Sequence, residues 1–129
     1  MVDGVDAMLR ALETVSAANL AVRQQLEMNE RLMRTLMGLL EGGTPLFTAL
    51  GSLGWVEQRN ASDEAIRALY TSRRHLREVA VAVALDEGRE VAEIATAFDL
   101  NHNQLIGPVA EHSTRAASRV VDGPAPGQG

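Results

Sequence analysis

The side chains able to do covalent or metal chemistry are few in this sequence and are not spaced for it. The three histidines, His75, His102 and His112, show no metal-ligand spacing within one helical turn. Ser113 and Thr114 directly follow His112, but sequence neighbours do not give the geometry of a nucleophile and its base. There is no cysteine, which excludes disulfides and thiolate zinc sites. We therefore expect no enzyme, no metal and no cofactor.

Without catalytic or metal-binding residues, the function that the side chains can still support is non-covalent binding, in particular of the phosphates and bases of nucleic acid. The stretch "SRRHLR" holds the densest basic cluster of the chain, formed by Arg73, Arg74 and Arg77. Guanidinium groups match phosphate oxygens in a two-pronged geometry, so this cluster fits a phosphate-contacting face. A solvated helix face explains it equally well. The net charge of −5 argues against a non-specific nucleic-acid coat, but it leaves room for a local basic face.

The segment "EGREVAEIATAFDLNHNQL" predicts two short helices joined by a turn. Ala95 stands where two helices cross closely, and Asn101 stands where a capping residue opens the second helix. The core positions are apolar: Ile94, Phe98, Leu100 and Leu105. Over about residues 88–107, this pattern resembles the helix-turn-helix segment of bacterial transcription regulators.

The resemblance implies a second helix that reads base edges. In this chain the reading residues would be His102, Asn103 and Gln104, and Asn or Gln side chains pair with adenine through two hydrogen bonds. The arginines at 73, 74 and 77 would hold phosphates. Arg115 and Arg119 would add backbone contacts from the last helix.

The segment departs from the family pattern at the turn and in the reading helix. Asp99 stands where glycine is usual, which is acceptable because Asp tolerates left-handed backbone. The stretch "NHNQLIGP" has no Arg or Lys, and Gly107 and Pro108 are expected to end this helix, with a new one starting at Pro108. Four acidic residues near the first helix would repel a facing duplex: Asp86, Glu87, Glu90 and Glu93.

The alternative function is a helical scaffold or adaptor that docks a protein partner and does not bind DNA.

Residues 5–40 carry a seven-residue apolar repeat. With Val5 at position a, the a and d positions are apolar except at Asn19 and Asn29, which predicts a self-associating helix about 54 Å long. We expect a homodimer or a higher assembly, with the two helices parallel or antiparallel, and its interface residues are Leu12, Val15, Asn19, Val22, Leu26, Asn29, Met33 and Leu36. The alternative is an ordinary amphipathic helix packed in a monomeric core.

The expected fold is all-α, with a long N-terminal coiled-coil helix followed by a small helical domain that holds the helix-turn-helix-like unit. The apolar residues around Phe47 are expected to pack under the end of the coiled coil, and Ser62 to cap the third helix. The "MVDGVDAM" start is acidic instead of basic, so we expect no secretory signal, and no apolar run is long enough for a membrane. We therefore expect a cytoplasmic protein without membrane contact, in the bacterial nucleoid if it binds DNA. The expected parts are 1–41 for oligomerisation, 42–61 as a hinge with a short apolar helix, 62–121 as the helical domain and 122–129 as a disordered tail.

These features together predict sequence-specific DNA binding as a homodimer, in transcriptional regulation or nucleoid organisation.

Overall fold

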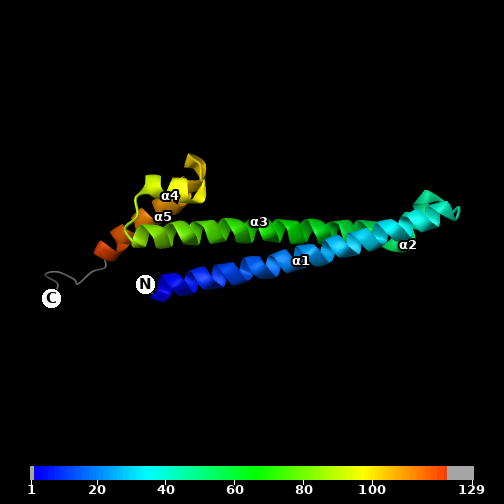
Figure 1. Ribbon diagram of the computed structural model, residues 1–129, viewed down its shortest axis with the longest axis horizontal. Coiled ribbons are helices and arrows are strands. Elements are labelled where there is room, and N and C mark those ends of the chain that lie inside the picture. Colours follow the sequence, from blue (N-terminus) through cyan, green and yellow to red (C-terminus); the bar gives the residue numbers. More distant parts are fainter. Residues whose placement is uncertain (1, 122–129) are drawn as a thin grey trace. The chain divides into compact units, whose positions relative to one another are not determined.

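The computed structural model describes residues 2–121, with the side chains of residues 2, 3, 102 and 116–121 excepted. It contains five helices and, within these residues, no strand, which confirms the all-α class and the long N-terminal helix. The helices are α1 (Val2–Glu41), α2 (Leu46–Leu53), α3 (Trp55–Asp86), α4 (Val91–Phe98) and α5 (His102–Val121) (Figure 1). The expected disordered tail, 122–129, lies outside the described residues.

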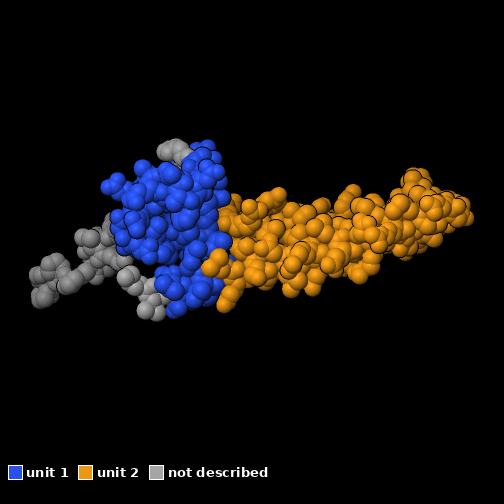
Figure 2. Space-filling model, in the orientation of Figure 1, with its two compact units in different colours: residues 1–11, 75–129 blue, residues 12–74 orange. Residues whose placement is uncertain are grey.

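The chain divides into two compact units, shown in different colours in Figure 2. Unit 1 comprises Met1–Ala11 and His75–Gly129, and unit 2 comprises Leu12–Arg74. Helices α1 and α3 therefore each contribute residues to both units.

Unit 2 is a helical hairpin, in which α1 and α3 run side by side in opposite directions with α2 between them in sequence (Figure 1). Gly43, with φ of 90°, ends α1, and the amide of Thr44 bonds the carbonyl of Leu39 at 2.9 Å. Gly54 ends α2 in the left-handed conformation. Helix α3 then begins at Trp55 instead of Ser62, because no glycine or proline interrupts the chain between Gly54 and the end of α3.

A layer of polar side chains joins the two long helices of the hairpin. Gln58 Nε2 donates to Gln25 Oε1 at 2.8 Å and to Asn29 Oδ1 at 3.0 Å. The Ser62 hydroxyl donates to Asn29 Oδ1 at 3.1 Å, and Ser62 is buried. Ser62 therefore belongs to the interior of the hairpin and does not cap a helix. Because these bonds need matching positions, the layer fixes the register of α1 against α3.

The expected apolar plug is formed only in part, and Phe47 does not join it. Phe47 is 87% exposed and Leu46 is 49% exposed, whereas Leu50, Leu53 and Trp55 are half-buried and Ala49 is the buried residue of α2. An eight-residue helix has one narrow face that can pack, and in α2 the small Ala49 occupies it.

Unit 1 packs the C-terminal part of α3 with α4 and α5. Val81, Ile94 and Leu105, one from each helix, are buried together. Ala84, Leu85, Ala95, Leu100 and Val109 pack around them. The apolar residues expected from the motif to be in the core thus do form it, except Phe98, which is 44% exposed.

Helix α5 does not break at Pro108, in contrast to the expectation. Pro108 lies inside a single helix, although it has no amide to donate to the preceding turn. Leu105 and Val109 on either side pack on the core of unit 1, and Pro108 itself is buried. This packing offsets the lost backbone hydrogen bond and keeps the helix continuous.

Candidate nucleic-acid interface

The turn between α4 and α5 is built by three consecutive residues. Asp99 has φ of 53°, the left-handed conformation that ends α4, and it is the only non-glycine residue with positive φ in the described chain. The amide of Leu100 donates to the carbonyl of Ala95 at 2.9 Å. Asn101 then opens α5, because its Oδ1 accepts from the amide of Gln104 at 2.9 Å. The turn residues that the sequence indicated therefore do set the direction of α5.

The three residues predicted to contact bases lie in the first turn of α5, and the described ones differ in burial and in hydrogen bonding. Gln104 is half-buried, and its Oε1 accepts from the amide of Asn101 at 2.9 Å, which completes a reciprocal cap. Asn103 is exposed. The side chain of His102 lies outside the described residues. Among the described candidates, Asn103 is thus the amide side chain that α5 presents to its surroundings.

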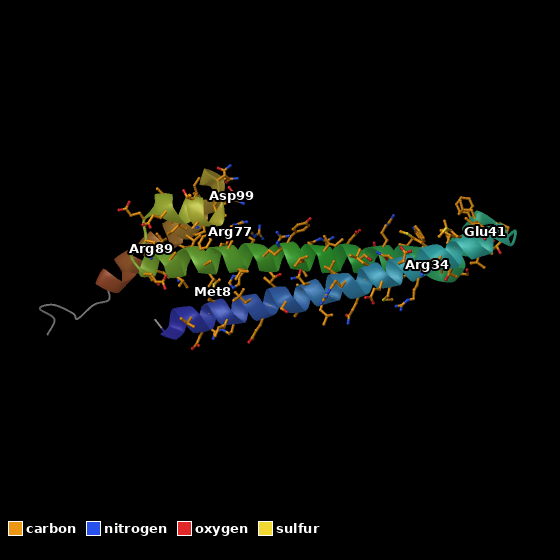
Figure 3. The ribbon with its side chains drawn as sticks, in the orientation of Figure 1. Met8, Arg34, Glu41, Arg77, Arg89 and Asp99 are labelled. Atoms are coloured by element: carbon orange, nitrogen blue, oxygen red, sulfur yellow. The ribbon has the colours of Figure 1, made fainter. Side chains whose placement is uncertain are left out.

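The predicted phosphate-binding arginines lie on α3. Arg73 and Arg74 are exposed and are the last two residues of unit 2. Arg77 belongs to unit 1, is half-buried, and has a buried Nε without a hydrogen-bond partner (Figure 3). A buried donor of a charged group without an acceptor is costly. Because this Nε is enclosed, a phosphate oxygen does not reach it unless the Arg77 side chain moves.

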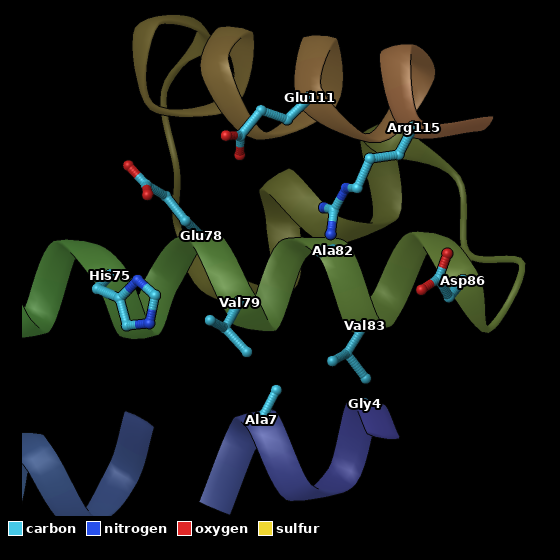
Figure 4. A pocket seen from close by; sticks show the side chains of 10 residues that line it. All are labelled: Gly4, Ala7, His75, Glu78, Val79, Ala82, Val83, Asp86, Glu111 and Arg115. Atoms are coloured by element: carbon cyan, nitrogen blue, oxygen red, sulfur yellow. The ribbon is translucent and has the colours of Figure 1, made fainter. Parts of the chain in front are cut away.

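Arg115 lies in a different environment. It lines a hollow of about 360 Å³ in unit 1, together with Glu78, Asp86 and Glu111 (Figure 4). Figure 4 shows it reaching from α5 toward α3 near Ala82, whereas Val79 and Val83 point to the other side of α3, toward α1. This setting favours a role in which Arg115 balances the carboxylates of its own unit. The side chain of Arg119 lies outside the described residues.

Most of the acidic residues that flank α4 are engaged within unit 1. Glu90 and Glu93 form the reciprocal cap at the start of α4, and Glu93 also pairs with Arg89 at 3.4 Å. Asp86 Oδ1 lies 2.8 Å from His112 Nε2. Glu90 and Glu93 thus act at the N-terminus of α4, where a negative charge is favourable, whereas Asp86 is the last residue of α3 and has His112 as its local partner.

The eight predicted interface residues of α1 differ in solvent exposure according to their heptad position. Leu12, Asn19, Leu26 and Met33, at position a, are exposed. Val15, Val22, Asn29 and Leu36, at position d, are half-buried, and Asn29 bonds to α3. Helix α3 thus occupies the d edge within the same chain, and the a edge stays open.

Among the described residues, no group of His, Asp and Glu side chains is arranged to hold a metal ion. None of the described helices combines the length and apolar character needed to cross a membrane. Comparison with protein-family models, with characterised proteins and with solved structures finds no match to this chain.

Proposed function

We propose that the chain binds DNA sequence-specifically as a homodimer, in transcriptional regulation or nucleoid organisation, and that unit 1 makes the base contacts. The observation that carries this proposal is the junction of α4 and α5. A left-handed residue ends α4, a reciprocal cap opens α5, and a small core from three helices holds both. Such a unit presents the first turn of its last helix at the surface, as a major-groove reader requires.

The roles of the side chains follow from their settings. Asn103 is exposed in the first turn of α5 and offers the donor and acceptor that adenine matches. Arg77 is a half-buried cation of α3, and its positive charge attracts the phosphate backbone. Arg73 and Arg74, one turn earlier on the same helix, add exposed positive charge.

Charge reversal of one exposed arginine tests the proposal. Arg74→Glu removes a phosphate contact, whereas Arg31→Glu makes the same charge change at an exposed position of α1. We expect Arg74→Glu to weaken binding across all DNA sequences and Arg31→Glu to leave binding close to wild type. Equal affinities of the two variants would contradict the assignment of Arg74.

Asn103→Ala tests base reading separately from charge. Loss of one two-pronged base contact costs about 1–3 kcal/mol, which is roughly a 5- to 150-fold loss of affinity for the preferred site. Binding to unrelated duplexes should not change, because a neutral side chain contributes little to counterion release. A uniform loss over all sequences would contradict base reading by Asn103.

The second candidate is an adaptor that docks a protein. Three large apolar side chains of α4 and α5 are exposed, Val91 at 43%, Phe98 at 44% and Ile106 at 51%. Exposed apolar residues gathered on two adjacent helices suit a protein surface better than a phosphate backbone. If the chain is an adaptor, the wild-type protein should bind no DNA duplex even at low salt. Wild type and Arg74→Glu should then behave alike in the DNA-binding assay.

A further inference from the structure

Unit 2 lacks an apolar core of its own. Its buried residues are Ala49, Ser62 and Ser72, and no large apolar side chain of residues 12–74 is buried. Hydrophobic burial is the dominant stabilising contribution in folding. A hairpin held by a polar layer and half-buried side chains therefore needs a further apolar partner.

An open apolar stripe runs along α1 in this unit. The exposed residues Leu12, Leu26, Met33 and Leu40 are 45%, 55%, 48% and 41% exposed and recur at position a. Leu20 and Met37 beside them are 47% and 54% exposed. Asn19 is the single polar residue at position a between Leu12 and Leu40. We call these seven residues the open stripe.

The open stripe and the face toward α3 are different sides of α1. Positions d and g, such as Val15, Val22 and Leu32, are half-buried. At 3.6 residues per turn, position a lies roughly 90° around the helix from the centre of positions d and g, and Leu20 at position b and Met37 at position e lie still further from that centre. A helix with two apolar faces at this angle requires two neighbours, as in a helical bundle. Helix α3 supplies one neighbour, and the other position is vacant.

A shallow groove of about 210 Å³ continues the open stripe onto α3. Met33 of α1 and Trp55, Arg59 and Ile66 of α3 line it, and Asn29 and Ser62 of the polar layer lie between them. Ile66 is 36% exposed and Tyr70, one turn further along α3, is 64% exposed. Both helices of the hairpin therefore offer apolar side chains to a partner.

We propose that a second copy of this chain covers the open stripe, so that two hairpins form a four-helix assembly. The position-a residues of the open stripe, from Leu12 to Leu40, span about 42 Å and recur every seven residues, which a partner helix must match over that whole length. The same stripe on a second copy meets both requirements. Asn19 then lies within the seam, where a single polar residue at position a favours one register.

The apolar surface available is sufficient for such a dimer. A fully exposed aliphatic side chain offers roughly 60–120 Å², so the six half-exposed apolar residues of the stripe offer roughly 180–360 Å² per copy. A small stable interface buries about 600 Å² per partner, of which about 65% is apolar in homodimers. Ile66 and Tyr70 supply the remaining apolar area. This inference rests on the dimeric state in the proposed function and not on DNA contact, because the mass is measured without DNA.

The mass of the full chain in solution tests the proposal. We expect twice the 13.9 kDa chain mass by light scattering at about 100 µM, and a melting temperature that rises with chain concentration. A wild-type mass of one chain, or a melting temperature independent of concentration, would overturn the proposal.

A matched pair of variants locates the interface. Leu26→Glu with Met33→Glu places two charges in the open stripe, and Ala17→Glu with Gln24→Glu makes the same charge change at exposed positions outside both apolar faces. The stripe variant should have the mass of one chain and reduced helical circular dichroism, with a dissociation constant raised at least about 100-fold. The control variant should keep the dimer. A dimeric stripe variant would overturn the proposal, and so would equal dissociation of both variants.

Discussion

Ile94 is the central residue of the small core that sets α4 and α5 against α3. It is 2% exposed and packs with Val81 and Leu105. Replacing a buried isoleucine by alanine costs about 2–5 kcal/mol, from lost transfer free energy and the cavity that remains. One kcal/mol lowers the melting temperature by about 4–8 °C in a domain of 60–100 residues. Ile94→Ala should therefore lower the melting temperature of unit 1 by at least about 8 °C.

Ile106→Ala is the matched control, because it deletes the same atoms from a residue that is 51% exposed. About half of its transfer free energy is already lost to solvent, and alanine is the better helix former, so we expect a cost below about 1 kcal/mol. Thermal unfolding followed by circular dichroism at one chain concentration compares the two, and amide hydrogen exchange shows which helices open. If the two variants have the same melting temperature, or if α4 and α5 stay protected in Ile94→Ala, the packing described for unit 1 is wrong.

Four further substitutions test local features, each by thermal or urea unfolding. Asp99→Gly should stabilise unit 1 by up to about 1 kcal/mol, because glycine adopts the left-handed conformation without strain, and destabilisation would contradict the turn. Asn101→Ala should cost about 1 kcal/mol through loss of the cap at α5, and no cost would mean that the cap is not formed in solution. Gln58→Ala should cost about 1–3 kcal/mol, because Gln25 Oε1 loses its donor and Asn29 Oδ1 keeps only Ser62, and a neutral result would contradict the polar layer. Asn19→Leu should raise the melting temperature of the dimer, and an unchanged mass and melting temperature would contradict the heptad assignment.

The seven-residue repeat of α1 could be predicted from the sequence, but the edge of α1 that packs against another helix could not. The period predicts the length of the helix and its apolar edge, and the structure has that helix. Which edge is covered depends on α3, whose packing against α1 is set by contacts between residues far apart in sequence, such as Asn29 with Ser62. The placement of Ser62 inside α3 shows the same limit. A serine followed by acidic residues has the composition of a helix start, and tertiary hydrogen bonding gave it another role.

The turn between α4 and α5 was more accessible to prediction, because it depends on local chemistry. Asp99 and Asn101 carry the conformations and caps that their types favour. The role of Gln104 in the cap was missed, although Asn followed three residues later by Gln is the pattern of a reciprocal cap. The predicted helix break at Pro108 is wrong, because α5 continues through it. The packing of Leu105 and Val109 that stabilises this helix depends on the tertiary structure and cannot be predicted from the local sequence.

Selection of bound sequences from a pool of random DNA duplexes tests the proposed function most directly, with binding compared at about 50 and 200 mM salt. We expect enrichment of a palindromic site whose half-sites are spaced for two reading units, and an affinity that falls steeply as salt rises. No binding and no enrichment at the lower salt concentration would contradict DNA recognition by unit 1, and would direct attention to Phe98 and Ile106 as a protein-docking surface.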